Sequence, residues 1–517
     1  MEQESRGRTS RRRRARDGGG EAPRREVNYR QLRNPFPQMA VFSDDQVAAM
    51  HDAALQMLEE LGIKVLLPEA RKIFARAGAR VDESSQMVYL GRDIIAEALS
   101  TAPKSITARA ATRERDLLLE LGSLTFQCGA GAPHATDLER GRRPGTGRDF
   151  REFTRIVQHY DVLHMMPPVV EPQDIATNVR HYFTMEAQLS LSDKLPFVFS
   201  RGTPQVTESF ELLANFRGLT DDAFRKDPHC YTIINTNSPR VLDIPMAQGL
   251  IDFARHRQLA IVTPFTLMGA MAPITVAGAI TLSHAEALAA IALTQLTNPG
   301  APVMYGTFTS NVDMKSGAPA FGTPEYMRAT QMTGQLARFY KLPMRASGVC
   351  AANVPDGQAM WETSNSLWSG VQAGAHMIYH AAGWLEGGLI ASPEKFVMDC
   401  EVLQQIQRYM EPEIFATGED EIALDAIRSV GNAGHFFGIQ HTQDRYTTAF
   451  YQPFLSDWKN FEGWEAAGAV WTPERAHHLF KEIIGSFEPP PMDIAIRDEL
   501  AEFVERRKAE GGAPTDF

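Results

Sequence analysis

The chain has 517 residues, of which 44 % are hydrophobic, and it carries a formal net charge of −11. This length allows one large α/β domain with added segments, and the negative charge argues against a general nucleic-acid binder. No stretch approaches 18 consecutive uncharged apolar residues, so we expect no membrane-spanning helix. The four cysteines lie far apart without a C-x-x-C pair, which favours reduced thiols and a cytoplasmic location.

The first segment is rich in arginine and glycine. Residues 1–26 hold nine Arg against five Asp and Glu, and Arg11 to Arg14 form an unbroken run. Because apolar residues are almost absent, residues 1–30 are predicted to be a disordered, solvated tail. Contact with an acidic partner protein is the alternative. A twin-arginine export signal would need an apolar segment next, and none follows.

Residues 31–145 predict a helical cap with a small antiparallel β-sheet. Ser43 begins a capping box with Gln46, and the helix that follows should end at Gly62. Two shorter helices are predicted near 68–77 and 92–99. The pattern then turns to β, with strands predicted at 117–119 and 124–127 and a glycine-rich bend at 128–133.

Strand and helix patterns alternate regularly from residue 146 to about residue 455. The predicted strands are 162–166, 196–200, 230–235, 260–264, 303–307, 342–349 and 377–380, with an eighth near His435–Ile439. Strands separated by helices of this length should be parallel with right-handed crossovers. The alternation predicts an α/β fold of the (β/α)₈ TIM barrel type, with C-terminal helices over residues 456–517. A doubly wound open sheet is the competing architecture, but no G-x-G-x-x-G follows a strand.

The stretch from Thr323 to Trp384 shows this alternation most clearly. Thr323 caps a helix whose first turn contains Pro324 and which ends before Lys341. A short strand, a tight loop, a second helix and a second strand follow. In barrels, the loops that leave the carboxyl ends of the strands hold the chemistry.

Aromatic and polar side chains gather at these predicted strand ends. The candidate substrate-binding residues are Asn235, Tyr305, Phe308, Arg345, Tyr379, His380 and Trp384, with Phe126 and Gly131 as a lid from the N-terminal part. Aromatic faces with few acidic groups suit a quaternary ammonium. His380, with Asn235 or Arg345, would bind an anionic end, and His380 with Tyr379 would orient the ligand. The alternative for each residue singly is core packing or a rim contact, and for the lid a plain tight turn.

Common catalytic and metal-binding signatures are absent. The chain contains no H-E-x-x-H, no G-x-x-x-x-G-K-[ST] and no G-x-S-x-G. His229, Cys230 and Cys350 could contribute to a zinc site, but closely spaced thiolates are missing. Buried small hydrophobic side chains are the better interpretation of these cysteines, and no metal is predicted.

Several sequence runs, taken in order, resemble the trimethylamine methyltransferase family over about residues 40–490. They comprise 53–62, 273–279, 284–289, 298–306, 322–326, 354–358 and 441–451. The resemblance implies a (β/α)₈ barrel that passes a methyl group from an amine to the cobalt of a separate corrinoid protein. It therefore implies that the partner supplies the corrinoid and that no cofactor is tightly bound. Barrels of this size often self-associate, so we expect a homo-oligomer.

One loop distinguishes branches of that family. The founding members carry pyrrolysine in the loop that matches roughly Cys350–Val354, where this chain has only ordinary residues. The chain is therefore similar to the non-pyrrolysine branch of glycine betaine methyltransferases. This implies a quaternary amine substrate, such as glycine betaine, proline betaine or carnitine. The alternatives are a pyrrolysine-independent tertiary-amine methyltransferase, a non-catalytic quaternary-amine-binding barrel and a metal-dependent barrel enzyme.

Overall fold

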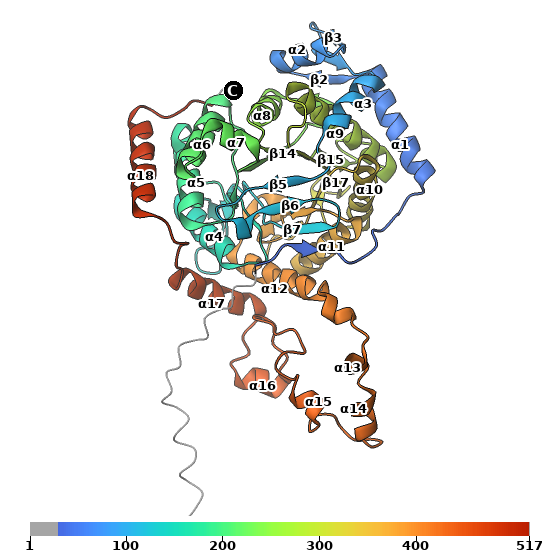
Figure 1. The fold of residues 1–517 in the computed structure, drawn as a ribbon, viewed down its shortest axis with the longest axis vertical. Helices are drawn as coiled ribbons and strands as arrows, with labels where there is room; N and C mark the ends of the chain where they lie inside the picture. The colour runs from blue at the N-terminus through green and yellow to red at the C-terminus, as the bar shows by residue number, and fades with distance from the viewer. Residues whose placement is uncertain (1–28, 516–517) are drawn as a thin grey trace, which may run out of the picture.

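The structure is a computed structural model that describes residues 29–515 as a mixed α/β fold around one main sheet (Figure 1). The sheet has seven strands in the order β1-β7-β20-β19-β16-β14-β12. All its neighbouring strands are parallel except β1 and β7. The strands are β1 (Leu32–Arg33), β7 (Ser123–Phe126), β12 (Tyr231–Ile234), β14 (Leu259–Val262), β16 (Val303–Gly306), β19 (Met344–Ser347) and β20 (Met377–Tyr379). Most of the predicted tail, residues 1–28, lies outside the described residues.

A two-stranded parallel sheet lies between β7 and β12. It consists of β10 (Met165–Met166) and β11 (Leu195–Pro196). The His164 N–H donates to the Phe126 carbonyl over 2.9 Å, which joins β10 to β7. On the other side, a parallel bridge between Phe197 and Tyr231 joins β11 to β12. Strand pairing thus defines a seven-stranded and a two-stranded sheet with single links between them.

Eight longer helices follow or precede these strands along the chain and surround the sheet in Figure 1. They are α4 (Gly147–His159), α5 (Thr177–Leu191), α6 (Thr203–Phe216), α8 (Ile244–Arg255), α9 (Val276–Thr297), α10 (Pro324–Tyr340), α11 (Gly357–Ala373) and α12 (Pro393–Tyr409). The predicted start of α10 is confirmed, because the Thr323 side chain accepts from the Tyr326 N–H and Pro324 occupies the first turn. The predicted end is also confirmed, because Lys341 caps the helix in the left-handed conformation.

Helix α9 is the most apolar element of the fold. Within the described residues it is the one helix long and apolar enough to cross a membrane, which the sequence pattern did not predict. However, 83 % of its apolar window is buried, and it packs against α1, α3, α8 and α10. A helix that is hydrophobic all round is typical of the interior of a large domain, and α9 occupies such a position here.

Two sequence predictions about strands were wrong. Residues 435–439 form no strand, and Phe436 and Phe437 there are exposed. Residues 124–127 were expected in a small antiparallel sheet, but β7 pairs in parallel with β20 through Met377 and Ile378. The reason is that β7 is buried along its whole length, and the pattern of so short a buried strand does not specify which strand it will pair with.

The N-terminal part contains the predicted capped helix and several small sheets. Helix α1 (Asp44–Gln56) has the Ser43–Gln46 capping box and continues as a π-helical turn, Met57–Leu61. The remaining elements before α4 are β2 (Ile63–Val65), α2 (Pro68–Arg76), β3 (Arg80–Asp82), β4 (Met87–Tyr89), α3 (Arg92–Thr101), β5 (Ile106–Ala108), β6 (Leu117–Leu119), β8 (His134–Ala135) and β9 (Arg143–Pro144). Short strands later in the chain are β13 (Val241–Leu242), β15 (Phe265–Met268), β17 (Phe308–Val312), β18 (Pro319–Ala320), β21 (Trp384–Leu385) and β22 (Ile390–Ala391).

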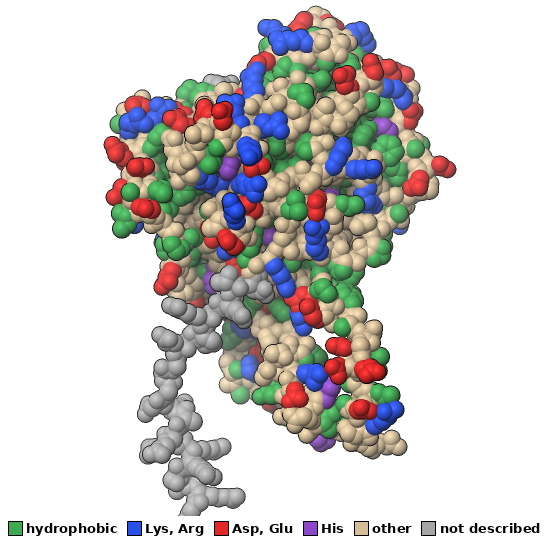
Figure 2. Space-filling model, viewed as in Figure 1, with side chains coloured by type: hydrophobic (Ala, Val, Ile, Leu, Met, Phe, Trp, Pro, Cys, Tyr) green, Lys and Arg blue, Asp and Glu red, His purple; other side chains and the backbone are tan. Residues whose placement is uncertain are grey.

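Residues 411–471 form an arm that projects from the body beyond α12 (Figure 1). The arm contains short helices, α13 (Glu419–Ile422), α14 (Leu424–Ser429), α15 (Gln440–Gln443) and α16 (Phe461–Ala466). Its large exposed hydrophobic residues are Ile414, Phe415, Ile422, Leu424, Ile427, Phe436, Phe437, Tyr446, Phe450, Trp458, Phe461 and Trp471. Acidic side chains also cover part of its surface (Figure 2). After the arm, α17 (Thr472–Gly485) packs on α12 and α4, and α18 (Ile494–Ala509) packs on α5 and α6.

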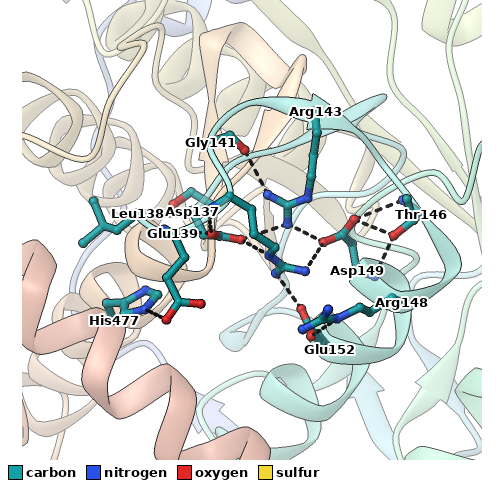
Figure 3. Close-up of polar contacts among 12 residues, drawn as sticks. Asp137, Leu138, Glu139, Gly141, Arg143, Thr146, Arg148, Asp149, Glu152 and His477 are labelled. Atoms are coloured by element: carbon teal, nitrogen blue, oxygen red, sulfur yellow. Dashed lines mark hydrogen bonds and ion pairs between the residues drawn. The ribbon is translucent and has the colours of Figure 1, made fainter.

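An ionic network fastens α17 to the body (Figure 3). His477 on α17 contacts Glu394 of α12 through Nδ1 at 2.7 Å and Glu139 through Nε2 at 3.2 Å. Close by, Arg143 pairs with both Asp137 and Asp149. Burial alone would lower the pKa of His477, but the two carboxylates outweigh it and raise that pKa above its ordinary value.

The raised pKa of His477 predicts a pH-dependent stability. The folded state favours the protonated imidazole, so its contribution is fully present below the unfolded pKa of about 6.5. That contribution is lost as pH rises through the higher folded pKa. The stability difference between wild type and His477→Gln should therefore shrink as pH rises from below about 6.5 through the higher folded pKa. Urea unfolding at several pH values measures this stability difference. His478→Gln, which changes the exposed neighbouring histidine, is the control. A difference that stays constant with pH would contradict the assignment.

Candidate functional site

A cavity of about 320 Å³ lies at the carboxyl ends of β12, β19 and β20 and the loop after β11. It is lined by Ala130, Phe197, Phe199, Ser200, Arg201, Thr232, Ile233, Asn235, Met246, Phe308, Arg345, Tyr379, His380 and Trp384. None of these lining residues is Asp or Glu. A larger hollow of about 920 Å³ opens within the arm, lined by residues 419–429 and 439–445. We regard the smaller cavity as the candidate site, because most of its lining residues are buried and they come from several strands.

Six of the nine predicted binding residues line this cavity. They are Asn235, Phe308, Arg345, Tyr379, His380 and Trp384. They come from five separate stretches of the chain. One stretch directly follows β12, and the other four lie in or directly after β17, β19, β20 and β21. The fold therefore brings together side chains that lie up to about 150 positions apart in the sequence.

Tyr305, Phe126 and Gly131 do not line the cavity. The Tyr305 hydroxyl contacts His284 Nδ1 at 2.9 Å on the side of the sheet that α9 covers. Phe126 is fully buried within β7. Gly131 adopts a left-handed φ of +75°, and its N–H donates to the carbonyl of Pro168, which lies far along the chain. Its neighbour Ala130 is the lining residue from this bend.

Aromatic rings form one wall of the cavity. His380 stacks on Trp384 with ring centroids 3.7 Å apart, and Phe308 lies 5.3 Å from His380 and 5.8 Å from Trp384. His380 has a φ of +56°, an uncommon conformation for a residue other than glycine. Such backbone conformations persist where the surrounding structure requires them, often at functional sites. The stack therefore holds His380 and Trp384 as one rigid aromatic surface.

The Trp384 segment is fixed from outside the cavity. The Cys350 thiol donates to the Trp384 carbonyl at 2.9 Å, and the Gly383 N–H donates to Asp399 over 2.9 Å. Asp399 pairs in turn with Lys395, whose ammonium also donates to Thr363. Lys395 and Asp399 are both buried. A buried ion pair on α12 thus holds the backbone from which the Trp384 ring extends.

Arg345 is the buried cation of the cavity. Its Nη1 donates to Thr263 at 2.9 Å, and its Nη2 lies 3.4 Å from His380 Nδ1. Burial lowers the pKa of Arg345 to about 10, so it stays protonated at neutral pH. Burial, with Arg345 beside it, also holds the pKa of His380 well below its ordinary value. His380 is therefore neutral, and because Arg345 can only donate, Nδ1 accepts and the proton resides on Nε2.

In the part of the cavity wall that follows β11, Phe199 was expected at a strand end, whereas Phe197, Ser200 and Arg201 were not among the predicted site residues. Phe197 and Phe199 pack edge to face at 4.9 Å, and the Arg201 guanidinium lies 4.1 Å from the centre of the Phe199 ring. Arg201 forms a two-pronged ion pair with Glu171, both bonds being 2.8 Å. The signal was present, because residues 197–200 belong to a predicted strand and Arg201 follows it directly.

Metal-ligating side chains are scattered in this fold. Among residues 29–515, no three His, Cys, Asp or Glu side chains lie close enough together to hold a metal ion. The four cysteines are buried and form no disulfide bond. Burial raises the pKa of Cys350 to about 11, so it is present as a thiol that donates to the Trp384 carbonyl.

Comparisons with known proteins agree with the resemblance seen in the sequence. The family model described as trimethylamine methyltransferase (MTTB) matches residues 5–512. The chain is 32 % identical to the glycine betaine methyltransferase of Desulfitobacterium hafniense strain Y51, over 92 % of this chain and 99 % of that protein. It is 30 % identical to the trimethylamine methyltransferase MttB of D. hafniense strain DSM 10664 / DCB-2, over 92 % and 95 %. The chain belongs to the trimethylamine methyltransferase family.

A comparison with solved structures gave weaker similarity. The crystal structure of the Methanosarcina barkeri monomethylamine methyltransferase (MtmB) covers 89 % of this chain and 94 % of its own, with a TM-score of 0.43 and 9 % identity. The hydroxylamine MtmB complex has the same score and identity.

Proposed function

We propose that the protein transfers a methyl group from a small quaternary amine, glycine betaine or a related compound, to the cobalt of a separate corrinoid protein. Family membership and the relative named glycine betaine methyltransferase support this proposal. The observation that carries it is the cavity, which combines aromatic walls with an absence of Asp and Glu lining residues. Aromatic faces attract a quaternary ammonium without the tight ion pair that a carboxylate would form.

The reaction needs little more than orientation from the protein. The nitrogen–methyl bond breaks and its electron pair stays on nitrogen, so a neutral tertiary amine leaves. The electron pair of reduced cobalt(I) forms the new bond, which gives methyl-cobalt(III). No catalytic acid is required, because the substrate nitrogen is already cationic. Holding the bond in line with cobalt lowers the barrier by removing orientational freedom, whereas a very strong cation cage would oppose the loss of positive charge.

Each of the nine predicted binding residues has a role in this proposal. Phe308, Tyr379 and Trp384 would surround the trimethylammonium group, with His380 orienting it together with Tyr379. Asn235 and Arg345 provide the polar end of the cavity. Tyr305, Phe126 and Gly131 would act indirectly, by supporting the strands and the bend behind the wall.

We also propose that the strands close into a (β/α)₈ barrel formed by β7, β10, β11, β12, β14, β16, β19 and β20. Support comes from the links between β7 and β10 and between β11 and β12. In this proposal the barrel occupies residues 146–455, with β7 contributed by the cap of residues 31–145 and helices following from residue 456.

The remaining proposals concern location and assembly. We propose a cytoplasmic protein with no tightly bound cofactor, whose corrinoid partner docks over the cavity. We further propose a homo-oligomer, which the exposed hydrophobic residues of the arm support, because large apolar patches mark interaction surfaces. Sedimentation of the purified chain would reveal the oligomeric state.

The proposed function is tested by mixing the protein with a reduced corrinoid protein and glycine betaine. We expect the cobalt(I) absorption to convert to that of methyl-cobalt(III), with one N,N-dimethylglycine formed per methyl group transferred. Omitting either the protein or the amine provides the controls. If no quaternary amine yields methyl-cobalt, the proposed function is wrong. Reaction with trimethylamine alone would instead indicate a tertiary-amine methyltransferase.

A further inference from the structure

Arg345 carries a buried charge that no carboxylate of the described chain compensates. Its side chain is 1 % exposed, and it makes one hydrogen bond to a neutral hydroxyl and one weak contact to a neutral imidazole. Its Nε has no partner among residues 29–515. Phe308 and Tyr379 face it, at 5.4 and 5.0 Å from ring centre to guanidinium. A buried charge without a counter-charge is strongly unfavourable, so the cavity is incomplete without an anion.

Two further polar atoms, from residues that line the cavity, are also buried without a hydrogen-bond partner in the described chain. They are Thr232 Oγ1 and Trp384 Nε1. Unsatisfied buried polar atoms at a cavity wall indicate a polar ligand. Nε of Arg345 and Nε1 of Trp384 are donors only, so the matching group on that ligand is an acceptor.

The second arginine of the cavity, Arg201, has a carboxylate partner and is partly exposed to solvent. Both oxygens of Glu171 bind Arg201, and Arg180 binds Glu171 as well at 2.7 Å. An incoming anion therefore gains less binding energy at Arg201, which already has a carboxylate partner, than at Arg345, which has none in the described chain. This difference assigns the anionic end of the ligand to the Arg345 end of the cavity.

We propose that Arg345 is the specificity-determining residue of the cavity, which binds the carboxylate of a zwitterionic betaine and thereby excludes quaternary amines that lack one. The proposal rests on the proposed function and narrows its substrate class. Choline and tetramethylammonium would place a second positive charge beside Arg345 with nothing to offset it. A betaine brings one negative charge for Arg345 and one positive charge for the aromatic wall.

The same charge would also assist methyl transfer. A bound betaine has no net charge, whereas the amine left behind carries one negative charge on its carboxylate. Arg345 therefore attracts the product side of the reaction more strongly than the substrate side. Interactions that strengthen towards the transition state raise kcat rather than only lowering KM. Arg345 should thus affect both binding and the rate at saturating substrate.

Binding is tested by calorimetry without any corrinoid protein. Glycine betaine, proline betaine and carnitine are the zwitterionic probes, and choline and tetramethylammonium are the cationic ones. We expect wild type to bind at least one zwitterion and to bind the cations at least about 100-fold more weakly. Arg345→Met should weaken the zwitterion about 100-fold without weakening the cations. Arg345→Lys, which retains the charge, should recover part of the affinity. In the methyl-cobalt assay, the same variant should recover most of the kcat that Arg345→Met loses.

Arg217→Met is the matched control. Burial also lowers the pKa of Arg217 to about 10, but its guanidinium donates to the Arg109 carbonyl and contacts His229, outside the cavity. This variant should bind the zwitterions as wild type does, and thermal unfolding checks that all variants are folded.

The outcomes separate this inference from the proposed function. Equal affinity of wild type for choline and glycine betaine, no binding of any zwitterion, or unchanged zwitterion binding by folded Arg345→Met would each overturn the inference. Methyl-cobalt formation from glycine betaine would support the proposed function even then. Selective zwitterion binding that depends on Arg345, without methyl transfer, would support the inference and overturn the proposed function.

Discussion

Replacing Lys395 by methionine is expected to lower the free energy of unfolding by about 3–5 kcal/mol, because it leaves Asp399 as an unpaired buried charge. Lys395 and Asp399 are both about 1 % exposed in their side chains and lie one turn apart on α12. The only other donor to Asp399 in the described chain is the Gly383 N–H, at 2.9 Å. Urea unfolding followed by tryptophan fluorescence would measure the loss.

Two controls identify the unpaired charge as the cause. In Lys395→Met/Asp399→Asn, the neutral amide can still accept from Gly383, so this double variant should be more stable than the single one. Burial already raises the pKa of Asp399 despite Lys395 beside it. Without Lys395 that pKa should rise further, so the single variant should regain stability as pH falls and the carboxyl takes up a proton. A single variant as stable as wild type would show that the pair does not hold α12 to Gly383.

Gly388→Ala is expected to reduce kcat/KM for methyl transfer by about 100-fold, because it displaces the Trp384 ring. A Cβ at Gly388 would lie 2.1 Å from Cζ2 of Trp384 and 2.5 Å from Cε2, so the ring must move. That ring forms part of the cavity wall and stacks on His380. Methyl-cobalt formation at varied substrate concentration would measure the effect.

Gly78→Ala provides the matched control for backbone strain. Gly388 and Gly78 have similar φ values, +100° and +93°, but a Cβ at Gly78 meets no atom within 4 Å. Both variants should therefore lose stability through backbone strain, Gly388→Ala should lose more because of its clash with Trp384, and only Gly388→Ala should lose activity. Full activity in Gly388→Ala would mean that the position of the Trp384 ring does not matter for the reaction.

Local signals predicted the helices well. The start and end of α10 depend on Thr323, Pro324 and Lys341, and the capping box of α1 depends on Ser43 and Gln46. Capping is a contact between residues three or four positions apart, so the sequence alone specifies it. The pairing partners of the strands were harder to predict from the sequence, because paired strands lie far apart in the chain.

The candidate site was predicted in part, and Tyr305 and Arg345 show why. Both sit on parallel strands that are buried on both faces, so the sequence does not reveal which face points to the cavity. Arg345 lines the cavity, whereas its neighbours Met344 and Ala346 belong to the large hydrophobic core, which also contains residues of the surrounding helices. Tyr305 belongs to the same large core. Met304, its neighbour in the strand, belongs instead to a smaller buried cluster that also contains Leu259 and Ile261. A shift of one residue in a strand moves a side chain to the opposite face.

The sequence by itself determined the family, most helix boundaries and the kinds of side chain available at the strand ends. Tertiary structure decided that β7 joins the main sheet, which rings face the cavity, and that Arg345 is left without a carboxylate while Arg201 has one. The physical reason is the distance along the chain over which each kind of interaction acts. Capping and periodicity act within a few residues, whereas strand pairing, burial and charge compensation depend on groups that only the folded chain brings together.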